Sequence, residues 1–415
     1  MKSNHTHGSR GANDLFENED NDPGQVRMAD FERELHKHRP VTSFLRTDLV
    51  TDAADANLIN PWGMSDSGGG SPIWISQNGK GVTSLYGVAH DAATGVDKVT
   101  VDFNRPAVHV GPPTDPLSPT GSLSPTGQVF NPFNGAGLFT TKAFVLGNNV
   151  SATFMFATEE GTIEAWNGTL PDNTQTVTVV PSADGAMYTG LGIDHNPGDT
   201  PMLYAANFSA GTIDVFDGAF HQVTTLGPNA FTDSHMDDDF APFNVQVLSV
   251  GSEERVFVTY AREDALTPGR MADDGHGGGF VDEFDRQGKL IQRFESHGEL
   301  DTPWGLAIAP SSFGSFAGDL LVGNHGDGTI TVFDLDSHDD KPLGHLLDGT
   351  GHEITIDDLW GLIPGGSTTG PNAGTSAGNS GGIGTLYFTA GTDNGAHGLF
   401  GSLTPNATPL LGLCQ

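Results

Sequence analysis

Residues 203–216 have the sequence LYAANFSAGTIDVF, and this stretch decides the fold. A short apolar segment runs into a polar turn with a glycine at position 211, and a second segment follows that alternates apolar and polar residues and ends in an aromatic one. Alternation on both sides of a glycine turn is typical of a β-hairpin. The pattern recurs as FMFATEEGTIEAW at 154–166 and as LLVGNHGDGTITVF at 320–333. The chain therefore repeats a hairpin unit.

A second recurring unit is a Trp-Gly pair at the start of an apolar segment. It occurs as NPWGM at 60–64, TPWGL at 302–306 and DLWGL at 358–362, with weaker copies at 131–135, 189–193 and 241–245. Gly161 and Gly211 of the hairpin turns are 50 positions apart. A period near 50 with about four strands per unit is the signature of a β-propeller. Six copies predict an all-β, six-bladed β-propeller.

The repeat also predicts the boundaries and the closure of the ring. The last unit offers only three strands, and residues 43–50 form an unassigned alternating segment before the first unit. We expect this segment to be the outer strand of the last blade, because an unpaired edge would invite aggregation. The expected propeller domain is 41–405, between a disordered segment 1–40 and a tail 406–415, with blades at 57–105, 129–180, 185–228, 241–296, 301–348 and 357–405 plus 43–50.

Composition excludes several classes of partner. The chain has 18 basic and 52 acidic residues, a formal charge of −34, so it is a poor match for a nucleic acid. No run of 18 apolar residues predicts a membrane span, and the first residues lack the apolar region of a secretory signal. The single cysteine, Cys414, forms no disulfide framework. We expect a soluble, acidic monomer with an unknown protein, carbohydrate or small-molecule ligand.

Several of these motifs resemble those of an uncharacterised family of bacterial propeller proteins with NHL-like repeats. The resemblance rests on NLINPWG at 57–63, PTGQVFN at 125–131, GGFVDEFD at 278–285, LDTPWGLA at 300–307, GNHGDGTI at 323–330 and HGLFG at 397–401, which occur in order over residues 43–405. It implies a six-bladed propeller. It implies no particular reaction, and its members include proteins that look exported.

The three tryptophans of the Trp-Gly units have a structural interpretation. We expect Trp62, Trp304 and Trp360 to wedge between blades near the channel, with their indole N–H groups bonded locally. The glycines after them should permit close packing of the backbone where the six inner strands converge. The alternative is an aromatic lining for a ligand.

Polar residues gather on one predicted face of the disc, where the inner strands begin and where the turns between second and third strands lie. Oxygen and nitrogen side chains around a channel mouth suit a hard cation or a polar ligand. We expect the ligand-binding side chains to be Asn60, Glu159, Glu160, Asn207, Asn324, His325 and Asp393.

Two classes of function fit this arrangement. The pattern Gly-x-Ser-x-Gly occurs only at 374–378 and 378–382, inside a Gly-, Ser- and Asn-rich stretch that we expect to be a loop and not a strand-to-helix elbow. No phosphate-binding loop occurs in the sequence, and the two observations favour a non-enzymatic binding or interaction propeller. The alternative is a Ca²⁺-dependent hydrolase of the six-bladed lactonase or esterase type, for which catalytic residues are not identifiable. Ca²⁺ is the one cofactor that the acidic composition suggests.

Overall fold

The computed structural model describes residues 42–407, except for 68–70, 92–95, 102–106, 113–121, 136–141, 184, 195–199, 268, 270–271, 273–277, 295–297, 338–339 and 367–378. The predicted disordered segment 1–40 and residues 408–415 of the predicted tail lie outside the described residues. The expected boundaries of the domain and of its blades stay predictions.

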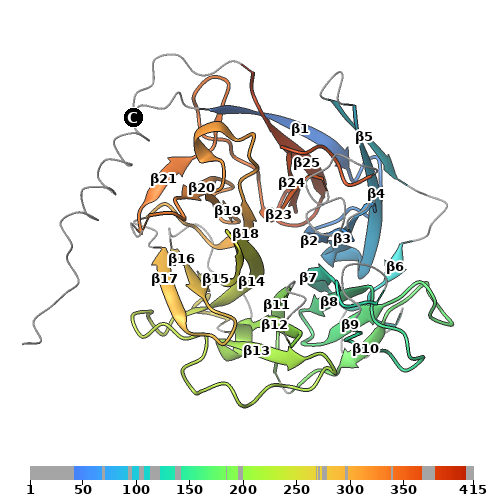
Figure 1. Cartoon of the computed structure of the whole chain (residues 1–415). Helices are drawn as coiled ribbons and strands as arrows, with labels where there is room; N and C mark the ends of the chain where they lie inside the picture. The colour runs from blue at the N-terminus through green and yellow to red at the C-terminus, as the bar shows by residue number, and fades with distance from the viewer. Residues whose placement is uncertain are drawn as a thin grey trace, which may run out of the picture.

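The described strands form six sheets around a common centre (Figure 1). Blade 1 holds β2 (Pro61–Ser65), β3 (Ile73–Gln77), β4 (Val82–Asp91), β5 (Val96–Val101) and β6 (Val108–His109). Blade 2 holds β7 (Pro125–Phe130), β8 (Phe154–Thr158), β9 (Ile163–Trp166) and β10 (Val177–Val180). Blade 3 holds β11 (Tyr188–Ile193), β12 (Met202–Asn207) and β13 (Thr212–Asp217).

The second half of the ring continues in chain order. Blade 4 holds β14 (Phe240–Val250), β15 (Glu253–Arg262), β16 (Gly279–Phe284) and β17 (Leu290–Phe294), and blade 5 holds β18 (Pro303–Ile308), β19 (Leu320–Asn324), β20 (Ile330–Phe333) and β21 (Pro342–His345). Blade 6 holds β23 (Leu359–Pro364), β24 (Leu386–Ala390), β25 (Leu399–Pro405), β1 (Ser43–Thr51) and β22 (Leu347–Asp348). Three short 3₁₀ turns are η1 (Asn78–Lys80), η2 (Phe208–Ala210) and η3 (Gly314–Phe316). The predicted six-bladed β-propeller is confirmed, with three to five strands per blade.

The first strand of each blade is its inner strand, and all six inner strands share one irregularity. Their pairing with the second strand shifts register within the first few residues, as at Pro61/Met64 in blade 1 and Pro303/Gly305 in blade 5. The other four shifts are at Pro125/Gln128, Tyr188/Gly190, Pro242/Asn244 and Leu359/Leu362. A bulge bends a strand and re-aims its side chains. The tryptophans of the Trp-Gly units lie inside these bulges.

Glycines in the inner strands touch the next blade around the ring. A Cβ atom added to Gly63 would lie within 3.0 Å of Thr126 in blade 2, and one added to Gly361 would lie within 3.0 Å of Trp62. The remaining pairs are Gly127 with Leu191, Gly190 with Asn244, and Gly305 with Trp360. Blade 4 has Asn244 at the corresponding place, and its Nδ2 donates to the carbonyl oxygen of Trp304 at 2.7 Å. The expected close packing of backbone around the channel is confirmed.

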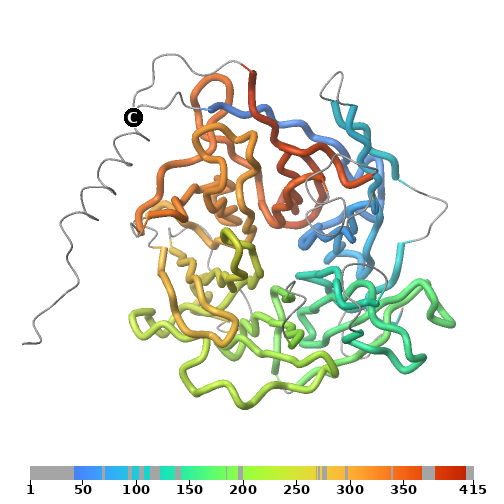
Figure 2. Tube along the Cα trace, viewed as in Figure 1, coloured from blue at the N-terminus to red at the C-terminus, as the bar shows by residue number. Residues whose placement is uncertain are grey.

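The ring closes where the two ends of the domain meet. Strand β1 pairs antiparallel with β25, from Phe44 opposite Pro405 to Thr51 opposite Leu399, and parallel with β22. In Figure 2 the blue tube of β1 runs beside the red C-terminal segment. The predicted closure by residues 43–50 is therefore confirmed, and the outer edge of β25 is covered.

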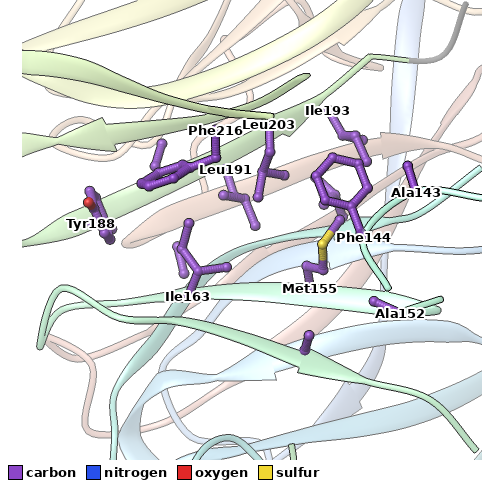
Figure 3. Close-up of a cluster of buried hydrophobic side chains, with 14 of the residues drawn as sticks. Ala143, Phe144, Ala152, Met155, Ile163, Tyr188, Leu191, Ile193, Leu203 and Phe216 are labelled. Atoms are coloured by element: carbon purple, nitrogen blue, oxygen red, sulfur yellow. The ribbon is translucent and has the colours of Figure 1, made fainter. Parts of the chain in front are cut away.

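Apolar side chains fill the spaces between neighbouring blades. Figure 3 shows the cluster between blades 2 and 3, in which Met155 and Ile163 of blade 2 lie against side chains of blade 3. Leu191, Leu203 and Phe216 supply that opposing surface, and all five side chains are buried. Because each blade contacts the next in this way, the inner strands are held rigidly around the centre.

The closure predicts a contrast between two neighbouring side chains of β1. Phe44 is 1% exposed and packs against Phe313 with ring centroids 4.7 Å apart, whereas Leu45 is 59% exposed. We expect Phe44→Ala to lower the free energy of unfolding by about 3 kcal/mol or more, because it leaves a cavity in the core. Leu45→Ala should change it by less than about 0.5 kcal/mol. Equilibrium urea unfolding measures both, and equal effects would contradict this account of the seam.

Candidate functional site

The disc has two faces, which we name from the inner strands. The strand-start face carries the first residues of the inner strands and the turns between second and third strands, such as η1 and η2. The strand-end face carries the last residues of the inner strands, such as Ser65 of β2 and Pro364 of β23. The sequence placed the ligand-binding residues on the strand-start face.

Aromatic side chains fill the centre of the ring toward the strand-start face. Trp62 and Trp360 stack with centroids 3.6 Å apart, and Trp304 contacts the two rings edge-on at 6.0 and 5.8 Å. Phe243 and Phe208 complete the cluster. The three tryptophans are 4–6% exposed. This aromatic cluster closes the centre of the ring on that side.

Two of the three indole N–H groups have local partners. Trp304 donates to the carbonyl oxygen of Thr189 at 3.0 Å, and Trp360 donates to Oδ1 of Asn60 at 3.2 Å. The Nε1 atom of Trp62 is buried and has no hydrogen-bond partner among the described residues. The tryptophans thus lie at the channel as a structural group, with one donor unused.

Asn60 has a backbone role as well as a side-chain role. Asn60, Thr302 and Asp358 stand two residues before the three tryptophans and have φ angles of 46°, 51° and 50°. Asn and Asp adopt this left-handed region more readily than most residues. The repeated geometry turns the chain into the inner strand.

A chain of contacts links several of the predicted site residues. Oε1 of Glu159 accepts from Nδ2 of Asn78 at 2.7 Å, and Oδ1 of Asn78 accepts from Nδ2 of Asn60 at 3.2 Å. Asn60 in turn accepts from Trp360, whose ring stacks on His325 at 3.9 Å. Turns of blades 1, 2 and 5 and the starts of the inner strands of blades 1 and 6 are thereby joined across the strand-start face.

Burial sets the protonation of the two ends of this chain. Burial raises the pKa of Glu159 to about 7, against the opposing hydrogen bond from Asn78, and the neighbouring Glu160 adds to the rise. Burial lowers the pKa of His325 to about 4, although Asp358 and Asp357 act in the opposite direction. His325 is therefore a neutral ring at pH 7.

The other predicted site residues bond within their own surroundings. Glu160 accepts from the backbone N and the hydroxyl of Ser124 at 2.8 and 3.1 Å. Asn207 caps η2 by accepting from the backbone N of Ala210 at 3.3 Å, and it donates to Asp214 at 2.9 Å. These side chains are not brought together with one another.

Asn324 and Asp393 are likewise set apart. Asn324 is fully buried and donates to the hydroxyls of Thr329 and Thr331 at 2.9 and 3.0 Å. Asp393 is exposed, has a φ of 58°, and donates its backbone N–H to Asp357 at 2.9 Å. A ligand role for the seven residues stays a prediction.

A cavity of about 570 Å³ lies in the centre of the ring. All six inner strands contribute to its wall, through residues 63–66 of blade 1, 127–130 and 132 of blade 2, 191–193 of blade 3, 244, 246–249 and 254 of blade 4, 304 and 308 of blade 5, and 361–364 of blade 6. Trp304 of the aromatic cluster lies at one end. Ser249, which is exposed, lies at the strand-end face, so the cavity opens there.

The wall of this central cavity is mostly apolar and carries few free polar groups. Gln128 lines it but accepts from Ser76 at 3.1 Å and donates to a backbone carbonyl. Gln246 also lines it, is half-buried, and has no side-chain hydrogen bond among the described residues. The buried Ser65 hydroxyl has no partner among them either. Gln246 and Ser65 are available to a ligand.

Two carboxylates are the only charged side chains that the described residues contribute to the wall. Asp66 follows β2, and Glu254 stands at the start of β15. Both therefore lie toward the strand-end face. Sequence reasoning missed Asp66, Glu254 and Gln246 as site residues, because none stands in a repeated motif. Their positions just after β2 and around the hairpin between β14 and β15 were the available signal.

The described residues show neither a metal-binding cluster nor a membrane-spanning helix. Among the described residues, no group of three or more His, Cys, Asp or Glu is placed to hold a metal ion. Within the same residues, no helix is long and apolar enough to cross a bilayer.

Comparison with other sequences finds viral relatives. No family model matches the chain. Two uncharacterised proteins of Acanthamoeba polyphaga mimivirus, R648 and L690, are 27% and 28% identical over 367 and 364 residues. The alignments cover 87% and 86% of this chain and 79% and 83% of those proteins. These relatives are viral, not bacterial as the motif resemblance predicted, and an NHL-like family is not shown.

Comparison with solved structures supports the fold alone. An alpha-L-arabinofuranosidase of Fusarium graminearum in complex with an iminosugar inhibitor matches with a TM-score of 0.50 at 9% identity, over 88% of this chain and 97% of that one. An aldose sugar dehydrogenase of Streptomyces coelicolor matches with a TM-score of 0.43 at 13% identity, over 88% and 100%. At such identities the likeness concerns architecture and not chemistry.

The raised pKa of Glu159 predicts a pH dependence of stability. Between the unfolded value near 4.5 and about 7, the folded protein holds a proton that the unfolded chain has released. Stability contributed by this group is thus full below pH 4.5 and declines as pH rises to about 7. Glu159→Gln removes the effect, so its melting temperature should gain on the parent's across that window. Thermal melts from pH 4 to 8 measure the difference.

Asp237→Asn is the control for that experiment, because Asp237 is an exposed carboxyl on the loop before blade 4. A constant offset between Glu159→Gln and the parent at every pH would show that the Glu159 carboxyl does not hold the proton.

Proposed function

We propose that the protein is a non-enzymatic binding propeller that takes a small, largely apolar molecule into the central cavity through the strand-end face. The observation that carries the proposal is the cavity itself. Its volume of about 570 Å³ falls within the range of small-molecule sites, roughly 300–1,000 Å³. Its wall is built from all six inner strands, so the site is preformed.

The chemistry of the wall supports binding of an apolar body with a few fixed polar contacts. Leu191, Ile193 and Leu362 give aliphatic surface, and Trp304 gives an aromatic one. Gln246 can hydrogen-bond a ligand without giving up a bond within the protein. Such a site holds its ligand by burial of apolar area and orients it by a small number of polar groups.

The other functions and properties predicted from the sequence rank below this proposal. The Ca²⁺-dependent hydrolase ranks below the binding propeller, because among the described residues only two carboxylates line the cavity. Ligand binding by the residues of the strand-start face, kinship with an NHL-like family, export and a monomeric state are likewise predictions.

Calorimetric titration with an uncharged indole alcohol, tryptophol, tests the proposed site. We expect saturable binding to the full chain. Gln246→Trp should weaken it about tenfold or more, because the added ring occupies the cavity; tenfold corresponds to about 1.4 kcal/mol. Thr100→Trp, on the exposed side of β5, adds the same ring away from the cavity and should bind as the parent does.

Unaltered binding by Gln246→Trp would place the indole elsewhere and remove the central cavity from consideration. Urea unfolding of the two variants shows whether each retains the parent's stability, so that a lost site is not confused with a lost fold.

A further inference from the structure

We propose that the ligand of the central cavity carries a positive charge, as an organic amine on an apolar body. This inference rests on the proposed function and names the class of molecule that the cavity takes. It is supported by the sign and the position of the charges in the cavity wall, and by the polar and apolar side chains that line the rest of the cavity.

The charge in the cavity wall is of one sign. Asp66 and Glu254 supply it, and the wall contains no Lys, Arg or His among the described residues. A narrow opening with low-dielectric walls focuses the field of the charges that line it. Phosphates and carboxylates are therefore disfavoured as ligands, and a cation is favoured.

The two carboxylates come from opposite sides of the ring. Asp66 belongs to blade 1 and Glu254 to blade 4, and in a ring of six these blades are opposite. Both residues are at the strand-end face, so an entering cation passes between two negative groups. A cation at the opening is attracted by both Asp66 and Glu254.

Arg286, in the turn between β16 and β17 of blade 4, pairs with a carboxylate of blade 3. Arg286 binds Asp194 through Nε to Oδ1 at 3.0 Å and through Nη2 to Oδ2 at 2.5 Å. Asp194 is fully buried and lies close enough to Glu254 for the Glu254 charge to act on it. Neither Arg286 nor Asp194 is among the residues that line the cavity, so this ion pair lies behind the wall.

Neutral polar groups near the opening complete the match to an amine. Ser65 precedes Asp66 and has a buried hydroxyl with no partner among the described residues, and Gln246 brings a side-chain carbonyl oxygen from blade 4. An ammonium group has three donors and no acceptor. Carboxylate, hydroxyl and amide oxygens can receive them.

The deeper part of the cavity suits the body of such a molecule. Trp304 lies at the closed end, and Val247 and Ile363 are part of the aliphatic wall. An aromatic or aliphatic ring buried here is removed from water, which stabilises the complex. The amine stays at the opening, near the two carboxylates. The apolar body of the ligand therefore lies at the closed end of the channel, and its ammonium group lies at the opening.

Three indoles of equal size and different charge test the proposal by calorimetry at pH 7: tryptamine, tryptophol and indole-3-acetate. With the full chain we expect tryptamine to bind about fivefold or more tighter than tryptophol, and indole-3-acetate to bind weakest. Raising NaCl from 0.05 to 0.5 M should weaken tryptamine binding selectively, because salt screens the attraction. This second measurement needs no variant.

Matched variants locate the charge. Asp66→Asn with Glu254→Gln should bring the affinity for tryptamine close to that for tryptophol, and Glu254→Gln alone should do so in part if the pair perturbs folding. Asp237→Asn with Asp238→Asn removes the same net charge from an exposed loop near the start of β14, and it should keep the preference.

The outcomes separate this inference from the proposed function. Equal affinity for tryptamine and tryptophol, with both lost in Gln246→Trp, would overturn the amine and leave the cavity as the binding site. A preference for tryptamine that survives the Asp66 and Glu254 changes would also overturn it. Failure of all three indoles to bind, or binding that survives Gln246→Trp, would overturn the proposed function itself.

Discussion

The backbones of neighbouring inner strands touch around the channel, and the rest of the structure depends on this contact. Five of the six junctions are made by a glycine whose absent Cβ would collide with the next blade, as at Gly63 and Gly361. The sixth uses Asn244, which reaches the next backbone with a hydrogen bond at 2.7 Å. A methyl group at a glycine junction would force two blades apart. Because the ring is closed, that displacement would have to be taken up by every other junction and by the seam between β1 and β25.

The same junctions decide which end of the channel is open. A tryptophan precedes the glycine in three blades, and the bulge at that place turns it toward the centre. Trp62, Trp304 and Trp360 then fill the ring near the strand-start face. Beyond the bulge the inner strands carry smaller or aliphatic residues, and the space between them remains as the central cavity. One short motif thus both closes the channel at one end and leaves it open at the other.

The parts of this protein that sequence could predict are those with a local or periodic cause. Hairpin alternation, the 50-residue period and the unassigned strand at 43–50 each follow from neighbouring residues, and they led to the blades and to the closure. The cavity has no such cause. Asp66, Gln246 and Glu254 become neighbours of one space only because blades 1 and 4 stand opposite, and the side on which the tryptophans lie depends on bulges that leave no mark in the hydropathy pattern. The contact between Glu159 and Asn78 also joins turns of different blades.

The polar residues in the turns of this propeller have structural roles, so the presence of polar side chains alone does not identify a ligand site. A turn leaves backbone N–H groups without strand partners, and a buried donor left so costs about 1–3 kcal/mol. Asn207 meets this need by capping η2, and Glu160 meets it by accepting from the backbone of Ser124. Their oxygens are thereby engaged in holding loops between blades. Gln246 stands in a regular strand whose backbone is already paired with β15, so its amide has no such duty. In this propeller, Gln246 is therefore a stronger pointer to a ligand than the polar side chains of the turns.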